Sequence, residues 1–180
     1  VMMSRALRRS CVLLVLVFAM QSRPAADPVF FEARIRDLRS PESVVRRSAA
    51  LALGESGDRS VAGPLAKALS DQDAGVRRGA AKALGCIRDP AATQQLIGAL
   101  SDGDANVRFY AAHALGEIKD ARAAGGLLRA LRDADWNVRN QAAWSLRELR
   151  DPTVMVGAMA AIRDVAADVA LIGWLIKQTD

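Results

Sequence analysis

The acidic and basic side chains of this 180-residue sequence recur in a fixed arrangement, Asp-x-Asp with an Arg four residues after the second Asp. Rows of carboxylates could bind a cation. An Asp ahead of a helix also caps its N-terminus, and an Arg can join two segments through a carboxylate. Catalytic groups occur once and scaffolding groups recur, so the exact repetition favours the structural interpretation. We assign these residues to inter-repeat structure: Arg46, Arg77, Arg108, Arg139, Asp73, Asp104 and Asp135.

Residue types that carry catalysis or bind metals are scarce in this chain. His113 is the only histidine, and Cys11 and Cys86 are the only cysteines. These counts argue against a His-rich metal site, a zinc ribbon and a disulfide framework. One His cannot define a catalytic triad without a Ser or Cys in a nucleophile turn, and the sequence has no phosphate loop or dinucleotide fingerprint. We therefore predict no catalytic residue, metal site or cofactor, and we interpret Cys86 as an incidental, partly exposed thiol.

A period of 31 residues organises most of the chain, in its leucines, its Val-Arg dipeptides and its Asp residues. Three of the columns are Leu38, Leu69, Leu100, Leu131 and Ile162; Arg46, Arg77, Arg108 and Arg139; and Asp27, Asp58, Asp89, Asp120 and Asp151. The first residue in phase is Asp27. The sequence therefore predicts one repeat domain over 27–180, with units 27–57, 58–88, 89–119, 120–150 and 151–180.

The segment 1–26 precedes the repeats and has a different composition. It carries four arginines and no acidic residue, and an apolar run of ten residues extends from Cys11 to Met20. Such a run is short for a membrane span and suits the core of a secretory signal peptide. We expect an exported protein, periplasmic or secreted. The alternatives are an uncleaved inner-membrane anchor, which alone would bring membrane contact, and a buried helix.

The net charge of +5 belongs mainly to that segment, because residues 27–180 contain 21 basic and 20 acidic residues. A nucleic-acid-binding domain carries a basic stripe on its folded part. A balance of +1 argues against such a partner without excluding a local basic patch.

The sequence of each repeat unit predicts two helices. An Asp at the N-cap, followed by Pro in Asp89-Pro90, opens the first helix, and apolar residues then recur at helical spacing. A short polar link leads to a second helix, for which a Gly such as Gly85 is the expected C-terminal stop. Helix pairs without a strand signal predict an all-α, right-handed α-solenoid of about five pairs.

The pattern D-x-D-x-x-V-R-x-x-A-A-x-A-L-G-x-I-x-D, complete from Asp102 to Asp120, resembles HEAT-like repeats of the phycobilisome-lyase type. The resemblance covers 27–180 and implies the α-solenoid fold. Because the shared residues are structural, it says little about function. Relatives include bilin lyases or isomerases, whereas HEAT-repeat enzymes that hold two irons need several His-Glu pairs, which this chain lacks.

Some columns of the second helix do not repeat, and their spacing places them on one arc of about 140°, opposite the arc of Ala and Leu residues. The resemblance to designed repeat scaffolds implies that these columns line the concave face and carry binding. We call their residues in the first four units the variable face: Ser43, Val44, Arg47, Ser48, Leu51, Ala74, Gly75, Arg78, Gly79, Lys82, Ala105, Asn106, Phe109, Tyr110, His113, Trp136, Asn137, Asn140, Gln141 and Trp144.

Four of the seven aromatic residues in 27–180 lie on the variable face, beside amides and His113. Such a combination is typical of interaction hot spots, although the rings could also pack on one another. The leading hypothesis is a non-catalytic scaffold with a protein or peptide partner. The alternatives are a bilin lyase or isomerase subunit and, more remotely, a nucleic-acid-binding solenoid. The predicted binding residues are Arg47, Arg78, Lys82, Phe109, Tyr110, His113, Trp136, Asn140 and Trp144.

Overall fold

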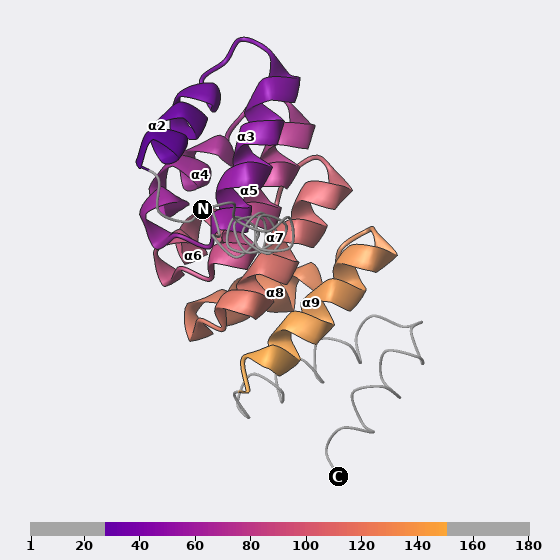
Figure 1. Ribbon diagram of the computed structural model, residues 1–180. Helices are drawn as coiled ribbons and strands as arrows, with labels where there is room; N and C mark the ends of the chain where they lie inside the picture. The colour runs from indigo at the N-terminus through magenta and orange to yellow at the C-terminus, as the bar shows by residue number, and fades with distance from the viewer. Residues whose placement is uncertain (1–27, 151–180) are drawn as a thin grey trace, which may run out of the picture.

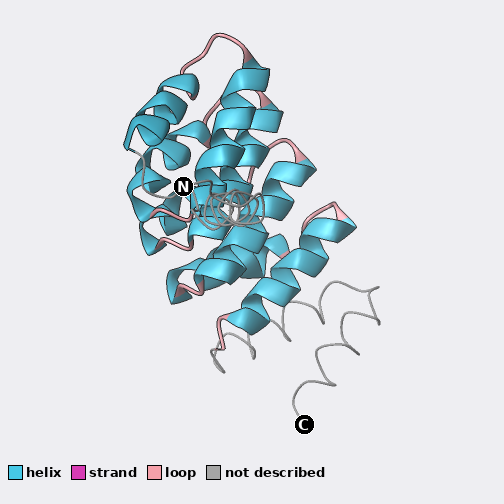
Figure 2. Cartoon of the chain, viewed as in Figure 1, coloured by secondary structure: helices cyan, strands magenta, loops and turns pink. Residues whose placement is uncertain are grey.

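The computed structural model describes residues 28–150, which form helices and connecting turns without a strand (Figures 1 and 2). The elements are α2 (Pro28–Asp37), α3 (Ser43–Ser56), η1 (Arg59–Val61), α4 (Ala62–Ala68), α5 (Ala74–Ile87), η2 (Pro90–Ala92), α6 (Thr93–Ala99), α7 (Ala105–Ile118), η3 (Ala121–Ala123), α8 (Ala124–Ala130) and α9 (Trp136–Glu148). The predicted export segment 1–26 and the predicted last unit 151–180 lie outside the described residues.

The first helix of each complete unit begins with a single 3-10 turn rather than as one continuous α-helix. Asp58, Asp89 and Asp120 precede these turns, and each carboxylate accepts a hydrogen bond from the backbone N–H two residues later. Each turn continues directly into a seven-residue α-helix, α4, α6 or α8. The tighter turn is common at helix starts, and here it takes the first three residues of each first helix.

The second helices, α3, α5, α7 and α9, are longer, at 13 or 14 residues. The predicted stop glycines are a wrong assignment, since Gly54, Gly85 and Gly116 lie inside these helices. The residues that end α5 and α7 in the left-handed conformation are Arg88 and Lys119, with φ of 55° and 59°.

Gly54 and Gly116 are needed for close approach between helices. A Cβ on Gly54 would lie 2.5 Å from the Cα of Ala83, and one on Gly116 would lie 2.9 Å from the Cα of Ser145. Real Cβ atoms essentially never come this near to backbone. A side chain at these positions would therefore push neighbouring second helices apart.

The chain is an α-solenoid of two helical layers (Figure 1). Helices α3, α5, α7 and α9 pack side by side in one layer, whereas α2, α4, α6 and α8 each pack mainly on the second helix of the same unit. Neighbouring second helices are in extensive contact, whereas neighbouring first helices have few direct contacts. The second helices therefore form the more closely spaced layer, which is the concave side of a curved array. Stability in such an array comes from contacts between neighbouring repeats.

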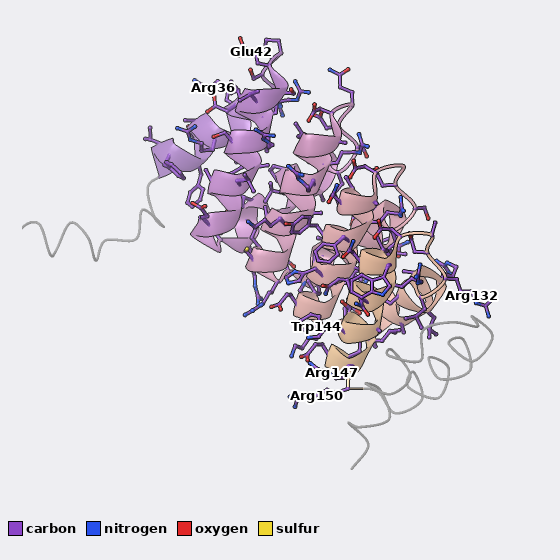
Figure 3. All side chains as sticks on the ribbon, turned by 90° about the vertical axis from the view of Figure 1, so that its right-hand side faces the viewer. Arg36, Glu42, Arg132, Trp144, Arg147 and Arg150 are labelled. Atoms are coloured by element: carbon purple, nitrogen blue, oxygen red, sulfur yellow. The ribbon has the colours of Figure 1, made fainter. Side chains whose placement is uncertain are left out.

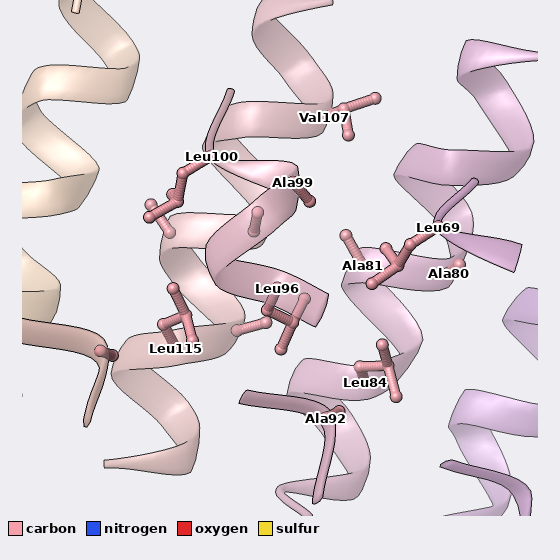
Figure 4. Packing of buried hydrophobic residues seen from close by; sticks show 14 of the residues in the cluster. Leu69, Ala80, Ala81, Leu84, Ala92, Leu96, Ala99, Leu100, Val107 and Leu115 are labelled. Carbon is pink, nitrogen blue, oxygen red and sulfur yellow. The ribbon is translucent and has the colours of Figure 1, made fainter. Parts of the chain in front are cut away.

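The core lies between the two layers and repeats with the units (Figure 4). Leu65, Leu96 and Leu127 point inward from the first helices, and Leu84 and Leu115 meet them from the second helices, all without solvent exposure. Burying one such side chain stabilises the fold by about 1.5–3 kcal/mol. This apolar seam fixes each second helix and leaves its opposite side available as a surface.

Candidate functional site

The recurring arginines join each link to the next unit. Arg77 donates from Nε to Asp102 Oδ2 at 2.7 Å and from Nη2 to Asp102 Oδ1 at 2.9 Å. Its Nη1 donates to the backbone carbonyl of Asp71, in its own link, at 2.8 Å. The bidentate pairs Arg46–Asp71 and Arg108–Asp133 repeat this geometry. We call these three pairs the Arg–Asp ladder.

The carboxylates of the Arg–Asp ladder belong to the first Asp of each link. The second, at Asp73, Asp104 and Asp135, caps its own helix instead of bridging repeats: Asp73 Oδ1 accepts from the backbone N–H of Val76 at 3.0 Å. The sequence assigned these three residues to contacts between repeats, whereas in the structure each of them caps the second helix of its own unit. Arg139 follows the pattern within its link and donates to the carbonyl of Asp133 at 2.9 Å.

Hydrogen bonds from the arginines stabilise the charged form of the ladder carboxylates. The bidentate bond from Arg77 holds the pKa of Asp102 below its usual value, against the opposing effect of burial. Arg46 lowers the pKa of Asp71 in the same way. These carboxylates are thus ionised partners of arginine, and among residues 28–150 no three His, Cys, Asp or Glu side chains gather as a metal site.

A second set of ion pairs lies at the other end of the second helices, and we call it the Glu ladder. Arg88 donates to Glu117, and Lys119 Nζ donates to Glu148 at 2.8 Å. The equivalent positions at the junction of α3 and α5 are Gly57 and Cys86, so both partners of the pair are replaced there. The Cys86 thiol is free and exposed.

The aromatic residues of the variable face form two contacts. Phe109 and Tyr110 on α7 meet edge to face, with ring centroids 5.2 Å apart, and both are half-buried against the core. His113 on α7 stacks on Trp144 on α9, with centroids 5.8 Å apart and ring planes 6° from parallel. Trp144 is labelled in Figure 3, which looks at the side of the molecule that is on the right in Figure 1. The rings therefore pack on one another and still contribute to the surface.

Trp136 and Asn140 lie on the same side of α9 as Trp144, at helical spacing. Trp136 is 54% exposed and is one of three large hydrophobic residues with high exposure in the described chain. Asn140 is half-buried. An exposed indole about two helical turns from a stacked His–Trp pair provides apolar area with polar atoms at its edge, which is the composition of a binding surface.

The variable face is recessed at α5, because Gly75 and Gly79 have no side chains to cover the helix backbone there. The stem of Arg47, from α3, fills this space. Its Cγ lies 3.5 Å from the position of a Cβ at residue 79, and its Cδ lies 3.5 Å from that at residue 75. Arg47 is thereby laid across α5, the helix that carries Arg78 and Lys82.

Two buried hydroxyl groups were not predicted as important. Ser145 Oγ donates to the backbone carbonyl of Ala112 at 2.7 Å, and Thr93 Oγ1 donates to Asp120 Oδ2 at 2.9 Å. Both bonds join neighbouring units. The sequence did contain a sign of the Ser145 bond, because Ser145 is the one polar residue at a position where the other units have Ala52, Ala83 and Ala114.

Helices long and apolar enough to cross a membrane do not occur between residues 28 and 150.

Known sequences and structures resemble this chain as a helical repeat. The sequence profile of HEAT repeats matches residues 32–105 and 95–172. No curated protein matches significantly. An engineered protein of known structure is 24% identical, with a TM-score of 0.62, and the match covers 83% of this chain and 73% of that protein.

Two similar structures carry information about ligands or partners. The complex of CpcE and CpcF of phycocyanin lyase from Nostoc sp. PCC7120 is 22% identical, with a TM-score of 0.55, over 81% of this chain and 74% of that one. A designed armadillo repeat protein in complex with the peptide (KR)4 is 17% identical, with a TM-score of 0.63, over 79% and 77%. At these identities the likeness establishes the solenoid fold alone. Human deoxyhypusine hydroxylase, 26% identical with a TM-score of 0.60, matches 67% of this chain but only 43% of its own.

Proposed function

The chain belongs to the HEAT-repeat family, and we propose that it is a non-catalytic scaffold that binds a protein or peptide partner on its variable face. A HEAT-repeat solenoid is a type of protein-interaction scaffold. Similar solenoids hold a peptide, in the designed armadillo repeat protein, or a second subunit, in the lyase complex. We further propose that the protein is exported, on the evidence of the apolar segment before the repeats.

The distribution of polar contacts supports this proposal. The two ladders use their charged side chains on internal partners, which gives them a structural role. The aromatic residues of α7 and α9 instead combine packing with exposure. Trp136 is the observation that carries the proposal, because its indole is 54% exposed on the variable face and a partner that covers it would remove this apolar surface from water.

The rigidity of the site also favours binding. The His113–Trp144 stack joins α7 to α9, and the buried bond from Ser145 to Ala112 joins the same two helices. A preformed surface loses little conformational freedom when it binds, so more of its contact energy appears as affinity.

The test is capture of partners by the full chain from the envelope of the native cell. The matched variants are Trp136→Ala with Trp144→Ala on the variable face, and Val29→Ala with Arg129→Ala on the first helices, each checked by circular dichroism. A protein captured by the native chain and the second variant, but lost with the first, supports the proposal. Equal capture by all three forms places the binding site elsewhere.

The likeness to the lyase subunits provides a second candidate, a bilin lyase or isomerase subunit. Co-expression with bilin and an acceptor protein tests it. Bilin absorbance that appears on the acceptor only in the presence of this chain would replace the scaffold with a lyase role.

A further inference from the structure

Resting on the proposed function, we propose that the partner presents an extended segment that combines a cluster of carboxylates with a run of apolar side chains. The carboxylates lie over α5, and the apolar residues lie over α7 and α9. The ligand is therefore an acidic–apolar peptide, opposite in charge to the (KR)4 peptide bound by the designed armadillo repeat protein.

Three cations belong to the α5 part of the variable face. Arg78 and Lys82 are four residues apart on α5 and therefore lie on one side of that helix, and the side chain of Arg47, from α3, lies over Gly75 and Gly79 of the same helix. Within residues 28–150 none of the three forms a hydrogen bond or an ion pair. Like charges held side by side repel, and an anionic ligand converts that repulsion into attraction.

No carboxylate of the variable face competes for these cations, because its columns contain neither Asp nor Glu in α3, α5, α7 or α9. Asp73 stands outside these columns, at the N-cap of α5, where its Oδ1 accepts a hydrogen bond from the backbone N–H of Val76, and among the described residues it forms no ion pair with Arg47. The cationic group is therefore available to an acidic ligand.

The part of the variable face on α7 and α9 has a different chemistry. It contains no lysine or arginine, and it combines the exposed Trp136 with the His113–Trp144 stack about two turns further along α9, which favours apolar side chains. Asn106 and Asn137 are exposed on the same helices and can donate to and accept from the backbone of an extended chain. The two ends of the surface thus select two kinds of residue in one segment.

The size of the surface sets the length of the segment. Neighbouring packed helices are about 8–10 Å apart, so the three spacings from α3 to α9 cover roughly 27 Å. An extended peptide rises about 3.3 Å per residue, and about eight or nine residues therefore cross the face. Each helix corresponds to two or three residues of such a ligand.

A single-stranded nucleic acid fits this surface less well. It carries a phosphate on every nucleotide and needs cations along the whole path. Here the cations are confined to Arg47, Arg78 and Lys82, and α7 and α9 have none on the variable face. A short acidic cluster matches this uneven charge.

The experiment measures fluorescence anisotropy of labelled nine-residue peptides with the full chain. The probes are a peptide of four acidic residues, a glycine and four apolar residues with two Phe, the same peptide in reversed order, the (KR)4 peptide, and oligodeoxythymidylate of eight nucleotides. The variant Arg78→Glu with Lys82→Glu reverses charge on α5. Its control, Arg59→Glu with Lys67→Glu, makes the same change at exposed positions of the first-helix layer.

We expect one order of the acidic–apolar peptide to bind at least tenfold more tightly than (KR)4. We expect the α5 variant to weaken it at least tenfold and the control to change it less than twofold. Equal binding of acidic and basic peptides, or equal effects of the two variants, overturns the inference. Tighter binding of the oligonucleotide, lost in the α5 variant, also overturns it and replaces the partner class.

Failure of this inference is distinguishable from failure of the proposed function. If the native partner is lost with Trp136→Ala and Trp144→Ala but bound normally by the α5 variant, the scaffold stands and the acidic ligand is refuted. If neither variant affects capture, the variable face is not the binding surface and both proposals fail.

Discussion

Asp102 accepts hydrogen bonds from two arginines at once. Its carboxylate receives the bidentate bond of Arg77, and its backbone carbonyl receives Nη1 of Arg108 at 2.8 Å. Asp102 Oδ1 also accepts a hydrogen bond from the backbone N–H of Asp104 at 2.9 Å, and this bond lies within the link itself. One residue thus joins Arg77 of the preceding unit to the link and the second helix of its own unit.

Substituting Asp102→Asn therefore destabilises the array. The amide keeps the shape of the side chain and removes the charge that faces Arg77, whose pair is mostly buried. Hydrogen bonds to charged groups contribute about 1.5–3 kcal/mol, and we expect a loss in that range in urea unfolding followed by circular dichroism. Glu32→Gln, at an exposed position of α2, is the control. Equal losses in the two variants would contradict the importance of the ladder.

Stability is expected to fall in acid, and Asp120 identifies part of the cause. The Arg122 guanidinium, the Arg122 backbone N–H and Thr93 hold the pKa of Asp120 at about 2, against an opposing effect of burial. The pKa of an unfolded Asp is about 3.9. Because the folded value is the lower one, the contribution is complete above about pH 4 and is lost as the pH falls to about 2.

The measurement is the urea midpoint between pH 7 and pH 2 for the native chain and for Asp120→Asn. Asn can still cap the 3-10 turn, so the substitution removes the charge and retains the cap. We expect the variant to have a smaller decrease between pH 4 and pH 2. Parallel curves for the two forms would show that Asp120 makes no contribution in this range.

The glycine positions separate close approach from helix propensity. We expect Gly54→Ala to destabilise the protein by more than about 1 kcal/mol, because the new methyl group would meet the backbone of Ala83. Gly98→Ala is the matched variant in α6, where a Cβ would have nothing within 4 Å. There the gain in helix propensity, about 0.5–1 kcal/mol, stabilises the fold. Thermal unfolding of both variants checks the opposite signs.

The two tryptophans of α9 have separable roles. Trp136→Ala removes an exposed ring, so we expect a change in unfolding free energy within about 0.5 kcal/mol and at least a tenfold loss of partner affinity. Trp144→Ala also removes the stack on His113, so we expect it to lower both stability and affinity. A Trp136→Ala variant that unfolds readily but binds normally would reverse this assignment.

The sequence predicted the solenoid because its determinants repeat. The 31-residue columns of leucine, Val-Arg and Asp indicated helix pairs and HEAT-like repeats, and the structure and the sequence profile confirm both. The role of Gly54 was missed because a glycine near a helix end looks the same in the sequence in two cases. It can end the helix, or it can leave room for a neighbouring helix to pack closely. Only the position of Ala83 distinguishes the two.

The residues of the candidate site were predictable as a set but their contacts were not. Helical spacing placed His113 and Trp144 on one side of their helices. Their stacking depends on how α7 is rotated against α9, which the period does not specify. The position of Arg47 over α5 likewise depends on Gly75 and Gly79, because the space that their missing side chains leave is filled by the Arg47 side chain. Whether these residues bind a partner stays a prediction.

The missing pair at Gly57 and Cys86 has a mechanical consequence. The junctions between α5 and α7 and between α7 and α9 are fastened at both ends of the helices, by one pair of each ladder. The junction between α3 and α5 is fastened only at the end where Arg46 meets Asp71. The α3–α5 junction therefore rests on the Arg46–Asp71 pair and on the close packing at Gly54. A substitution that removes Arg46 would leave this junction without a ladder pair, whereas loss of Arg77 or Arg108 would leave a pair of the Glu ladder in place.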